Sequence, residues 1–237
     1  MIEEVDEVQN GLAGVLRQHL DQSGNVDYFA LLAENSVVQY AKSLEDFNLK
    51  VLKTREERLA FWINVYNALS IYGVVKKLKQ DPGFARRGNK SLVQKARFFV
   101  MERFSVGGRR FSLWSLENYI RTEFKEPRIH FALNCSSLSC PPLRNGLYSA
   151  VNLESELEQA TRLYINGPHG SRLDRDNNVL WLSMIFKWYR KDFESVGVTV
   201  LDFVTRYLPE NDKQYAIENS DSLTIKHMDY DWSLNVQ

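Results

Sequence analysis

Apolar residues recur at helical spacing along much of the chain, and this pattern predicts a mostly helical protein. Over residues 1–21 they alternate with charged positions, as in an amphipathic helix. Residues 26–34 and 37–47 show the same period over shorter lengths. We therefore expect an N-terminal amphipathic helix over 1–25, followed by a single domain over 26–237.

One predicted helix is apolar on nearly every face. Thr54 and Glu57 have the spacing of a capping box, in which each side chain binds the other residue's backbone amide. Residues 59–78 then contain few charges, and Asp81 with the following proline ends the run. Because neighbours must cover all faces of such a helix, we expect it at the centre of the core.

Shorter runs predict a small amount of β structure. Residues 98–100 and 104–106 before a glycine pair, and 110–113 after it, predict a hairpin. Residues 128–135 are rich in β-branched and aromatic side chains, which is typical of a buried strand, and 179–182 predict another. Further helices are expected over 115–123, 153–165, 185–193 and 200–207. The predicted fold class is α+β, mostly helical with a small sheet.

Charge and composition narrow the functional classes. The chain has 30 Lys and Arg against 30 Asp and Glu, so it lacks the one-signed field that binds nucleic acid or an anionic membrane. The basic segment 86–90 is a local exception, predicted as an exposed loop. The acidic N-terminus lacks the features of a signal peptide. We expect a cytoplasmic protein with no nucleic-acid or membrane partner, no cofactor, and a protein or peptide substrate.

Two asparagines and a tyrosine interrupt the apolar helix. Asn64, Tyr66 and Asn67 are costly to bury unless their polar atoms find partners. One interpretation is that the amides bind backbone groups and hold two elements together. The other is that Asn64 and Asn67, three residues apart and so on one face, line a substrate cleft.

The rare thiols lie close to a histidine. The chain has only two cysteines, Cys135 and Cys140, and both follow His130 within ten residues. They could form a disulfide, half of a metal site, or a nucleophile with a bystander. A metal needs about four ligands, which the scattered remaining histidines do not offer. A disulfide conflicts with a cytoplasmic location unless it is regulatory.

Cys140 is the preferred nucleophile. Pro141 favours the first position of a helix, which would place Cys140 at its N-cap, where the helix dipole stabilises a thiolate. Cys135 is then the packing thiol and the alternative nucleophile. Glu117 is the nearest acid that could orient His130, although it could instead pair with Arg121 one helical turn away.

Aromatic residues and acids near the C-terminus are expected to fill the core. They occur at 184–193 and 230–232, where the acids would accept hydrogen bonds from indole or backbone donors.

These motifs together resemble the domain of unknown function 547 family, in order from about residue 26 to 235. The resemblance rests on Val26-Asp27-Tyr28, Arg58 to Ala68, Ser112 to Glu117, Arg128 to Leu143, Phe186 to Tyr189, Asp192-Phe193 and Tyr230 to Asn235.

The resemblance implies a cysteine-protease-like or transglutaminase-like site. On this chain the triad would be Cys140, or Cys135, with His130 and Glu117. The acid and histidine precede the cysteine, so the arrangement would be a circular permutation of the papain order. The family's Leu-x-x-Ile-Glu pattern is Leu113-Trp-Ser-Leu116-Glu117 here, which keeps the carboxylate.

Two functional hypotheses follow. In the first, the chain is a cysteine hydrolase or acyl-transferase acting on an amide or ester, with Asn134 or a backbone amide near the cysteine stabilising the oxyanion. In the second, it is a non-catalytic protein-interaction module in which the same residues are structural.

Overall fold

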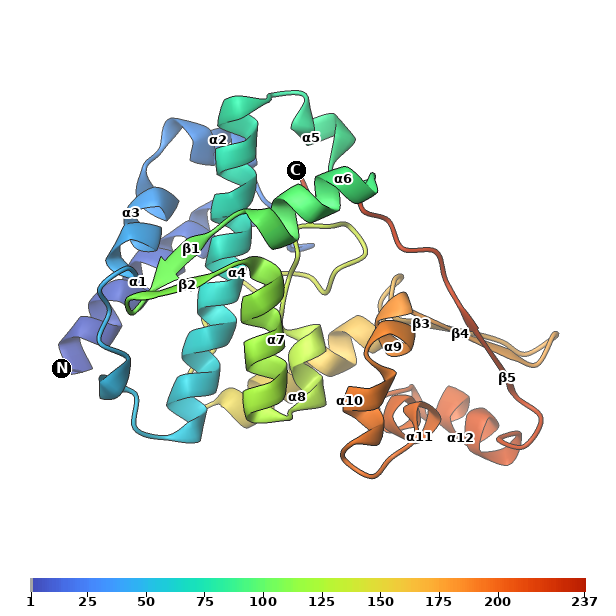
Figure 1. Cartoon of the computed structure of the whole chain (residues 1–237). Helices are drawn as coiled ribbons and strands as arrows, with labels where there is room; N and C mark the ends of the chain where they lie inside the picture. The colour runs from blue at the N-terminus through green and yellow to red at the C-terminus, as the bar shows by residue number, and fades with distance from the viewer. Residues whose placement is uncertain (1) are drawn as a thin grey trace. The chain divides into compact units, whose positions relative to one another are not determined.

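The computed structural model describes residues 2–237 and has the predicted α+β fold, mostly helical with small sheets (Figure 1). The longer helices are α1 (Ile2–His19), α3 (Ser36–Ser43), α4 (Arg55–Gln80), α7 (Leu113–Phe124), α8 (Leu153–Ile165) and α12 (Glu210–Glu218). The shorter helices are α2 (Tyr28–Ala33), α5 (Phe84–Arg87), α6 (Leu92–Lys95), α9 (Met184–Trp188), α10 (Arg190–Glu194) and α11 (Val200–Thr205). Two short 3₁₀ helices are η1 (Leu49–Val51) and η3 (Pro127–Phe131), and η2 (Ala96–Met101) is a π-helical segment.

Internal contacts divide the chain into two compact units. The first unit comprises Met1–Phe124, Leu133–Leu153 and Asp231–Gln237. The second comprises Lys125–Ala132 and Glu154–Tyr230. The chain therefore leaves the first unit and returns to it twice. The single domain expected over 26–237 stays a prediction.

Helix α4 is the centre of the first unit. Its N-terminus carries the predicted capping box, with the Glu57 amide bound to Thr54 Oγ1 at 3.1 Å and the Thr54 amide to Glu57 Oε2 at 2.9 Å. Helix α4 packs against α2, α3, α5 and α7, and nearly every residue from Leu59 to Leu78 is buried. The predicted all-round burial is confirmed.

The first sheet is the predicted hairpin, but shorter. Strands β1 (Phe104–Val106) and β2 (Arg109–Phe111) pair antiparallel across Gly107 and Gly108, both at positive φ. The expectation that 98–100 extends this hairpin is wrong, because these residues belong to the π-helical turn η2. Phe98 is buried there against Phe84, so tertiary packing outweighs its preference for a strand.

The second sheet belongs to the second unit. Strand β4 (Val179–Leu182), which was predicted, pairs antiparallel with β3 (Ser171–Asp174) and parallel with β5 (Thr224–His227). The sequences of β3 and β5 are mostly polar and their residues are only partly buried. No run of apolar residues therefore predicts these strands.

The strand predicted over 128–135 is wrong. Its first half is the short 3₁₀ helix η3, which begins at Pro127. Proline fits the first position of a helix, and Glu126 caps the turn by accepting the Arg128 amide at 3.1 Å. The guanidinium of Arg128 also binds Glu126 and Glu154, at 2.8 and 2.6 Å, which fixes the turn further.

Aromatic residues build the core of the second unit. Phe131, Phe186, Phe193 and Phe203 are all buried, with the Phe193 and Phe203 ring centroids 4.9 Å apart. The predicted core role is confirmed for Phe186 and Phe193. It is wrong for Trp188, which is 43% exposed. The Trp188 ring instead packs against Tyr230, with ring centroids 4.9 Å apart.

Among the described residues, no helix has the length and apolar character needed to cross a membrane.

Two glycines at positive φ provide a matched test of packing beside the cysteine segment. A methyl group on Gly24 would lie 2.7 Å from the Leu143 carbonyl oxygen, whereas one on Gly108 meets no described atom within 4 Å. We expect Gly108→Ala to lower the free energy of unfolding by about 1 kcal/mol, from backbone strain alone. Gly24→Ala should cost about 2–4 kcal/mol, because the backbone clash adds to the same strain. Urea unfolding measures both, and equal losses would contradict the close approach of Gly24 to Leu143.

Candidate functional site

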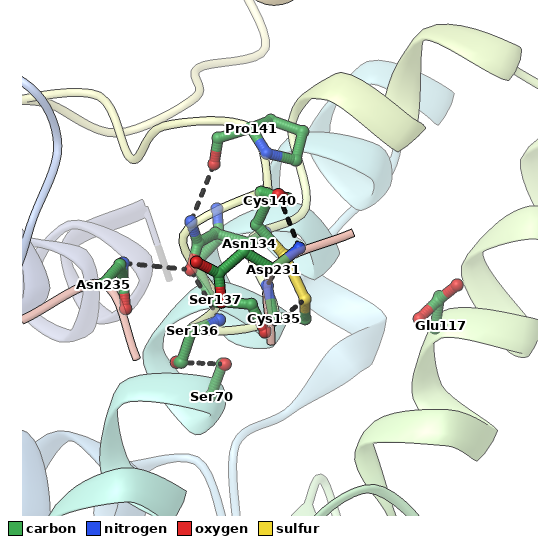
Figure 2. The surroundings of a disulfide bond; sticks show 12 residues. Ser70, Glu117, Asn134, Cys135, Ser136, Ser137, Cys140, Pro141, Asp231 and Asn235 are labelled. Carbon is green, nitrogen blue, oxygen red and sulfur yellow. Dashed lines mark hydrogen bonds between the residues drawn. A yellow bond between two sulfur atoms is a disulfide. The ribbon is translucent and has the colours of Figure 1, made fainter. Parts of the chain in front are cut away.

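Cys135 and Cys140 are joined by a disulfide, with their Cα atoms 6.1 Å apart (Figure 2). Of the three sequence-based alternatives for the thiols, the structure therefore has the disulfide. The expected helix after Cys140 is absent, since residues 141–150, all of them described, form irregular backbone. The N-cap interpretation of Cys140 is wrong: a residue that precedes a proline disfavours the helical region, so Pro142 keeps Pro141 from beginning a helix.

Asn134 anchors the disulfide segment. Its backbone amide donates to Asn67 Oδ1 at 2.8 Å, and its side-chain amide donates to the Pro141 carbonyl at 2.7 Å. Its side-chain oxygen accepts the Ser136 amide at 2.7 Å. Asn134 is only 2% exposed, so these bonds replace hydration that the residue has lost. Both ends of the disulfide loop are thereby tied to one buried side chain.

Ser136 holds an unusual backbone conformation within this loop. Its φ is 59°, in the left-handed region that non-glycine residues rarely adopt. Its hydroxyl lies 2.7 Å from the Ser70 hydroxyl of α4, and the residue is fully buried. The Asn134 and Ser70 contacts compensate the backbone strain, which amounts to about 1–3 kcal/mol for such a residue.

The C-terminal segment completes the surroundings of the disulfide loop. The Leu138 amide donates to the Ser233 carbonyl at 2.8 Å, and the Asp231 amide donates to Ser139 Oγ at 2.9 Å. Asn235 reaches Asn134 Oδ1 at 3.5 Å and accepts from the Tyr28 hydroxyl at 2.8 Å (Figure 2). The residues at 230–232 were expected to fill the core, with the acid accepting an indole or backbone donor. Asp231 is exposed and pairs with the disulfide loop through its backbone, while its side chain accepts the Ser233 amide at 2.8 Å, as expected.

Burial perturbs the ionisation of Tyr28 beside this network. Desolvation raises the pKa of the Tyr28 hydroxyl well above its usual range, and the nearby Ser136 acts weakly in the opposite direction. The hydroxyl therefore remains a neutral donor toward Asn235 at physiological pH.

The two sulfur atoms have different environments. The Cys135 backbone amide donates to Cys140 Sγ at 3.0 Å, and Cys140 is only 6% exposed. Cys135 is half-buried, and the Ser137 hydroxyl lies 3.5 Å from its Sγ. A backbone donor aimed at sulfur favours the thiolate form when the disulfide is opened, and this donor is aimed at Cys140.

The polar residues of α4 bind backbone on the loops that cover it. Asn64 pairs with Tyr148 through two bonds, from its amide to the carbonyl at 2.8 Å and from the Tyr148 amide to Oδ1 at 2.9 Å. Asn67 accepts the Asn134 amide. These are the structural contacts that the sequence predicts as one of two interpretations. A role of Asn64, Tyr66 and Asn67 in lining a substrate cleft stays a prediction.

Glu117 lies on α7, next to α4. The Tyr66 hydroxyl donates to Glu117 Oε2 at 3.2 Å. Figure 2 shows the Glu117 carboxylate set apart from the disulfide, on the neighbouring helix, with its side chain turned toward the loop.

His130 is positioned by residues of the second unit. Its Nε2 lies 2.7 Å from Asp192 Oδ2, and its ring stacks on Tyr189 with centroids 4.1 Å apart. Asp192 was not predicted as a partner of His130, because its position among aromatic residues indicated a core role. The three-residue spacing of Tyr189 and Asp192 places both on one side of a helical turn, but no pattern in the sequence indicates that they contact His130.

The predicted triad is distributed over the two units. Glu117, Cys135 and Cys140 belong to the first unit, and His130 belongs to the second. The carboxylate that hydrogen-bonds His130 is that of Asp192. The role of Glu117 in orienting the His130 ring stays a prediction. Within the part of the chain that the structure describes, no group of three His, Cys, Asp or Glu side chains is placed to hold a metal ion.

Comparison with known families matches residues 49–165 to the model described as Protein of unknown function, DUF547. The chain carries a DUF547 family domain over these residues. The DUF547 match includes all eight predicted site residues but neither Asp192 nor the C-terminal segment, and it is shorter than the resemblance over about 26–235. No curated protein and no solved structure matches the chain significantly.

Asn134 and Asn48 form a matched pair for testing the anchor. Each side-chain oxygen accepts the amide two residues ahead, but Asn134 is buried and Asn48 is exposed. We expect Asn134→Ala to lower the free energy of unfolding by at least about 2 kcal/mol, because it leaves buried backbone groups unpaired. Asn48→Ala should cost about 1 kcal/mol or less, since water replaces the lost cap. Similar losses in urea unfolding would show that Asn134 is not an anchor.

Proposed function

We propose that the chain is a thiol-dependent hydrolase or acyl-transferase whose nucleophile is released when the Cys135–Cys140 disulfide is reduced. The substrate class is an amide or ester, as in a cysteine peptidase. The observation that carries the proposal is the hydrogen bond from the Cys135 amide to Cys140 Sγ.

Reduction converts the disulfide into a pair of unequal thiols. An external dithiol supplies two electrons and two protons and becomes a disulfide itself, while Cys135 and Cys140 become thiols. The sulfur that accepts a backbone hydrogen bond has the lower thiol pKa, since the bond favours its charged form. We therefore assign Cys140 as the nucleophile and keep Cys135 as its redox partner.

The proposed reaction is acyl transfer. The Cys140 thiolate adds to the carbonyl carbon, and the C–N or C–O bond breaks as the leaving group takes up a proton. Water, or an acceptor nucleophile, then attacks the thioester, giving the acid or the transferred acyl product and regenerating the thiol. The roles predicted from the sequence, with His130 as the proton carrier and Glu117 as its carboxylate partner, stay predictions.

A backbone amide is the proposed oxyanion donor. The amides of Asn134, Ser136 and Cys140 are already bound to Asn67, Asn134 and Ser137. The Cys135 amide is bound to the reacting sulfur, so it becomes available when that sulfur forms its bond to carbon. The Asn134 side chain is less suited to this role, because its amide already serves the Pro141 carbonyl.

A second candidate function is a protein-interaction module with a structural disulfide. It is favoured by the buried network around Asn134, in which the asparagine side chains bind backbone atoms of the same unit. The two candidates differ in how the reduced protein behaves, and the following predictions separate them.

Alkylation after reduction tests the activation of Cys140. The Cys135→Ser variant isolates Cys140, and the Cys140→Ser variant isolates Cys135. We expect the iodoacetamide rate of the first variant to rise with an apparent pKa below the free-cysteine value of about 8.5, and that of the second to titrate at or above it. Mass spectrometry of labelled protein across pH gives both profiles. A Cys140 thiol pKa at or above that of a free cysteine would contradict the assignment of Cys140 as the nucleophile.

Reduction should leave the protein folded. The two cysteines are only five residues apart, so opening their loop removes about 2 kcal/mol at most by the chain-entropy argument. The polar network keeps the segment in place without the bond. Urea unfolding with and without a phosphine reductant measures the loss, and the Cys135→Ser/Cys140→Ser double variant should be insensitive to reductant. Complete unfolding on reduction would favour the structural disulfide and the interaction module.

A further inference from the structure

An exposed stripe of apolar and basic residues runs along α6 and η2 in the first unit, labelled α6 in Figure 1. The apolar–basic stripe consists of Leu92, Val93, Ala96, Arg97, Val100 and Met101, all of which are exposed. These residues form two rows spaced by four, 92–96–100 and 93–97–101, so they share one side of the helical run. The two rows make one continuous surface.

The opposite side of the same run is packed against the first unit. Phe98 is buried and contacts Phe84, with ring centroids 6.2 Å apart. Lys95 lies with its ammonium 3.7 Å from the centre of the Trp232 ring, and burial lowers its pKa. Because this side fixes the helix orientation, the exposure of the stripe follows from the fold rather than from a loosely attached segment.

The apolar side chains of the stripe are unusually open to water. Leu92 is 83% exposed, Val93 60%, Met101 67% and Val100 44%. Single exposed apolar residues are ordinary, but four large ones within ten residues form a contiguous patch, and such patches mark interaction surfaces.

Basic residues surround this patch. Arg86 and Lys90 precede it, Arg97 lies within it and Arg103 follows it, and all four are exposed. None of the four makes an ion pair with a side chain that the structure describes. The nearest acid, Glu102, is neutralised by Lys76 and Lys77. The stripe and the sequence on either side of it therefore carry four exposed positive charges, on a chain whose net charge is zero.

We propose that the apolar–basic stripe docks onto the surface of an anionic lipid bilayer. Its aliphatic side chains would enter the interface between headgroups and acyl chains, while Arg97 and Arg103 bind lipid phosphates, as in amphipathic helices that lie in the membrane plane. The proposal departs from the expectation of no membrane partner, which rests on the net charge of the whole chain. It is independent of the proposed thiol chemistry.

Charge complementarity selects a lipid surface over a second copy of the chain. A two-fold symmetric dimer through this stripe would bring two copies of the same positively charged patch together, and this juxtaposition of like charge is unfavourable. An anionic bilayer satisfies the cations and the aliphatic side chains at once. The stripe also lacks exposed aromatic residues, which commonly anchor protein interfaces.

Vesicle sedimentation of the full chain tests the proposal. We expect binding to phosphatidylcholine vesicles that contain phosphatidylserine, weaker binding at high salt, and little binding to phosphatidylcholine alone. Arg97→Gln and Arg103→Gln should each weaken the apparent affinity about five-fold, the effect of one basic residue at an anionic surface. Leu92→Gln with Met101→Gln should weaken it at least about ten-fold.

Matched controls lie at other exposed positions of the first unit. Val151→Gln removes an apolar side chain that is 93% exposed, and Arg110→Gln removes an exposed charge on β2. Both variants should bind like the unaltered protein, and circular dichroism checks that all variants fold. Equal binding to both vesicle types, no binding to either, or stripe variants that bind normally would overturn the proposal. So would concentration-dependent dimerisation in gel filtration that the Leu92 and Met101 substitutions abolish.

Discussion

Burying an irregular loop demands a partner for each of its backbone amides, and this demand shapes the first unit. The disulfide segment has no helix or sheet to satisfy its donors. Asn134, Ser137 and Cys140 accept amides from within the loop. Asn67 accepts one from α4, and the C-terminal segment accepts the amides of residues 138 and 139. Because an unpaired buried amide costs about 1–3 kcal/mol, these side chains are constrained by the fold whether or not the cysteines react.

The same demand explains the composition of α4. A helix buried on all sides could be entirely apolar, yet Asn64, Asn67 and Ser70 repeat every three residues along it. They form the row that faces the loops at 134–148, where the structure describes only an isolated β-bridge, between Ser137 and Leu234. The remaining faces meet other helices, whose backbones are already satisfied. Those faces are mostly apolar, and Tyr66 places its hydroxyl on Glu117 of α7.

Sequence alone predicted what depends on local pattern. The capping box at Thr54, the burial of α4 and the glycine hairpin follow from spacing along the chain. The errors lie where distant segments decide. Residues 128–131 resemble a strand in composition, but Pro127 and the Glu126 cap make them a helical turn. No local pattern could pair Asp192 with His130, or Asp231 with Ser139, since these partners are 62 and 92 residues apart.

The discontinuity of the first unit has a consequence for its biosynthesis. The C-terminal partners of the disulfide loop are translated long after the cysteines, since Asp231 follows Ser139 by 92 residues. At about 5–20 residues per second, the loop waits roughly 5 to 20 seconds for them, while residues 154–230 of the second unit are made. During that interval the two cysteines lack their final covering. Their oxidation state can therefore be set on the ribosome, by whatever redox partners the nascent chain meets there.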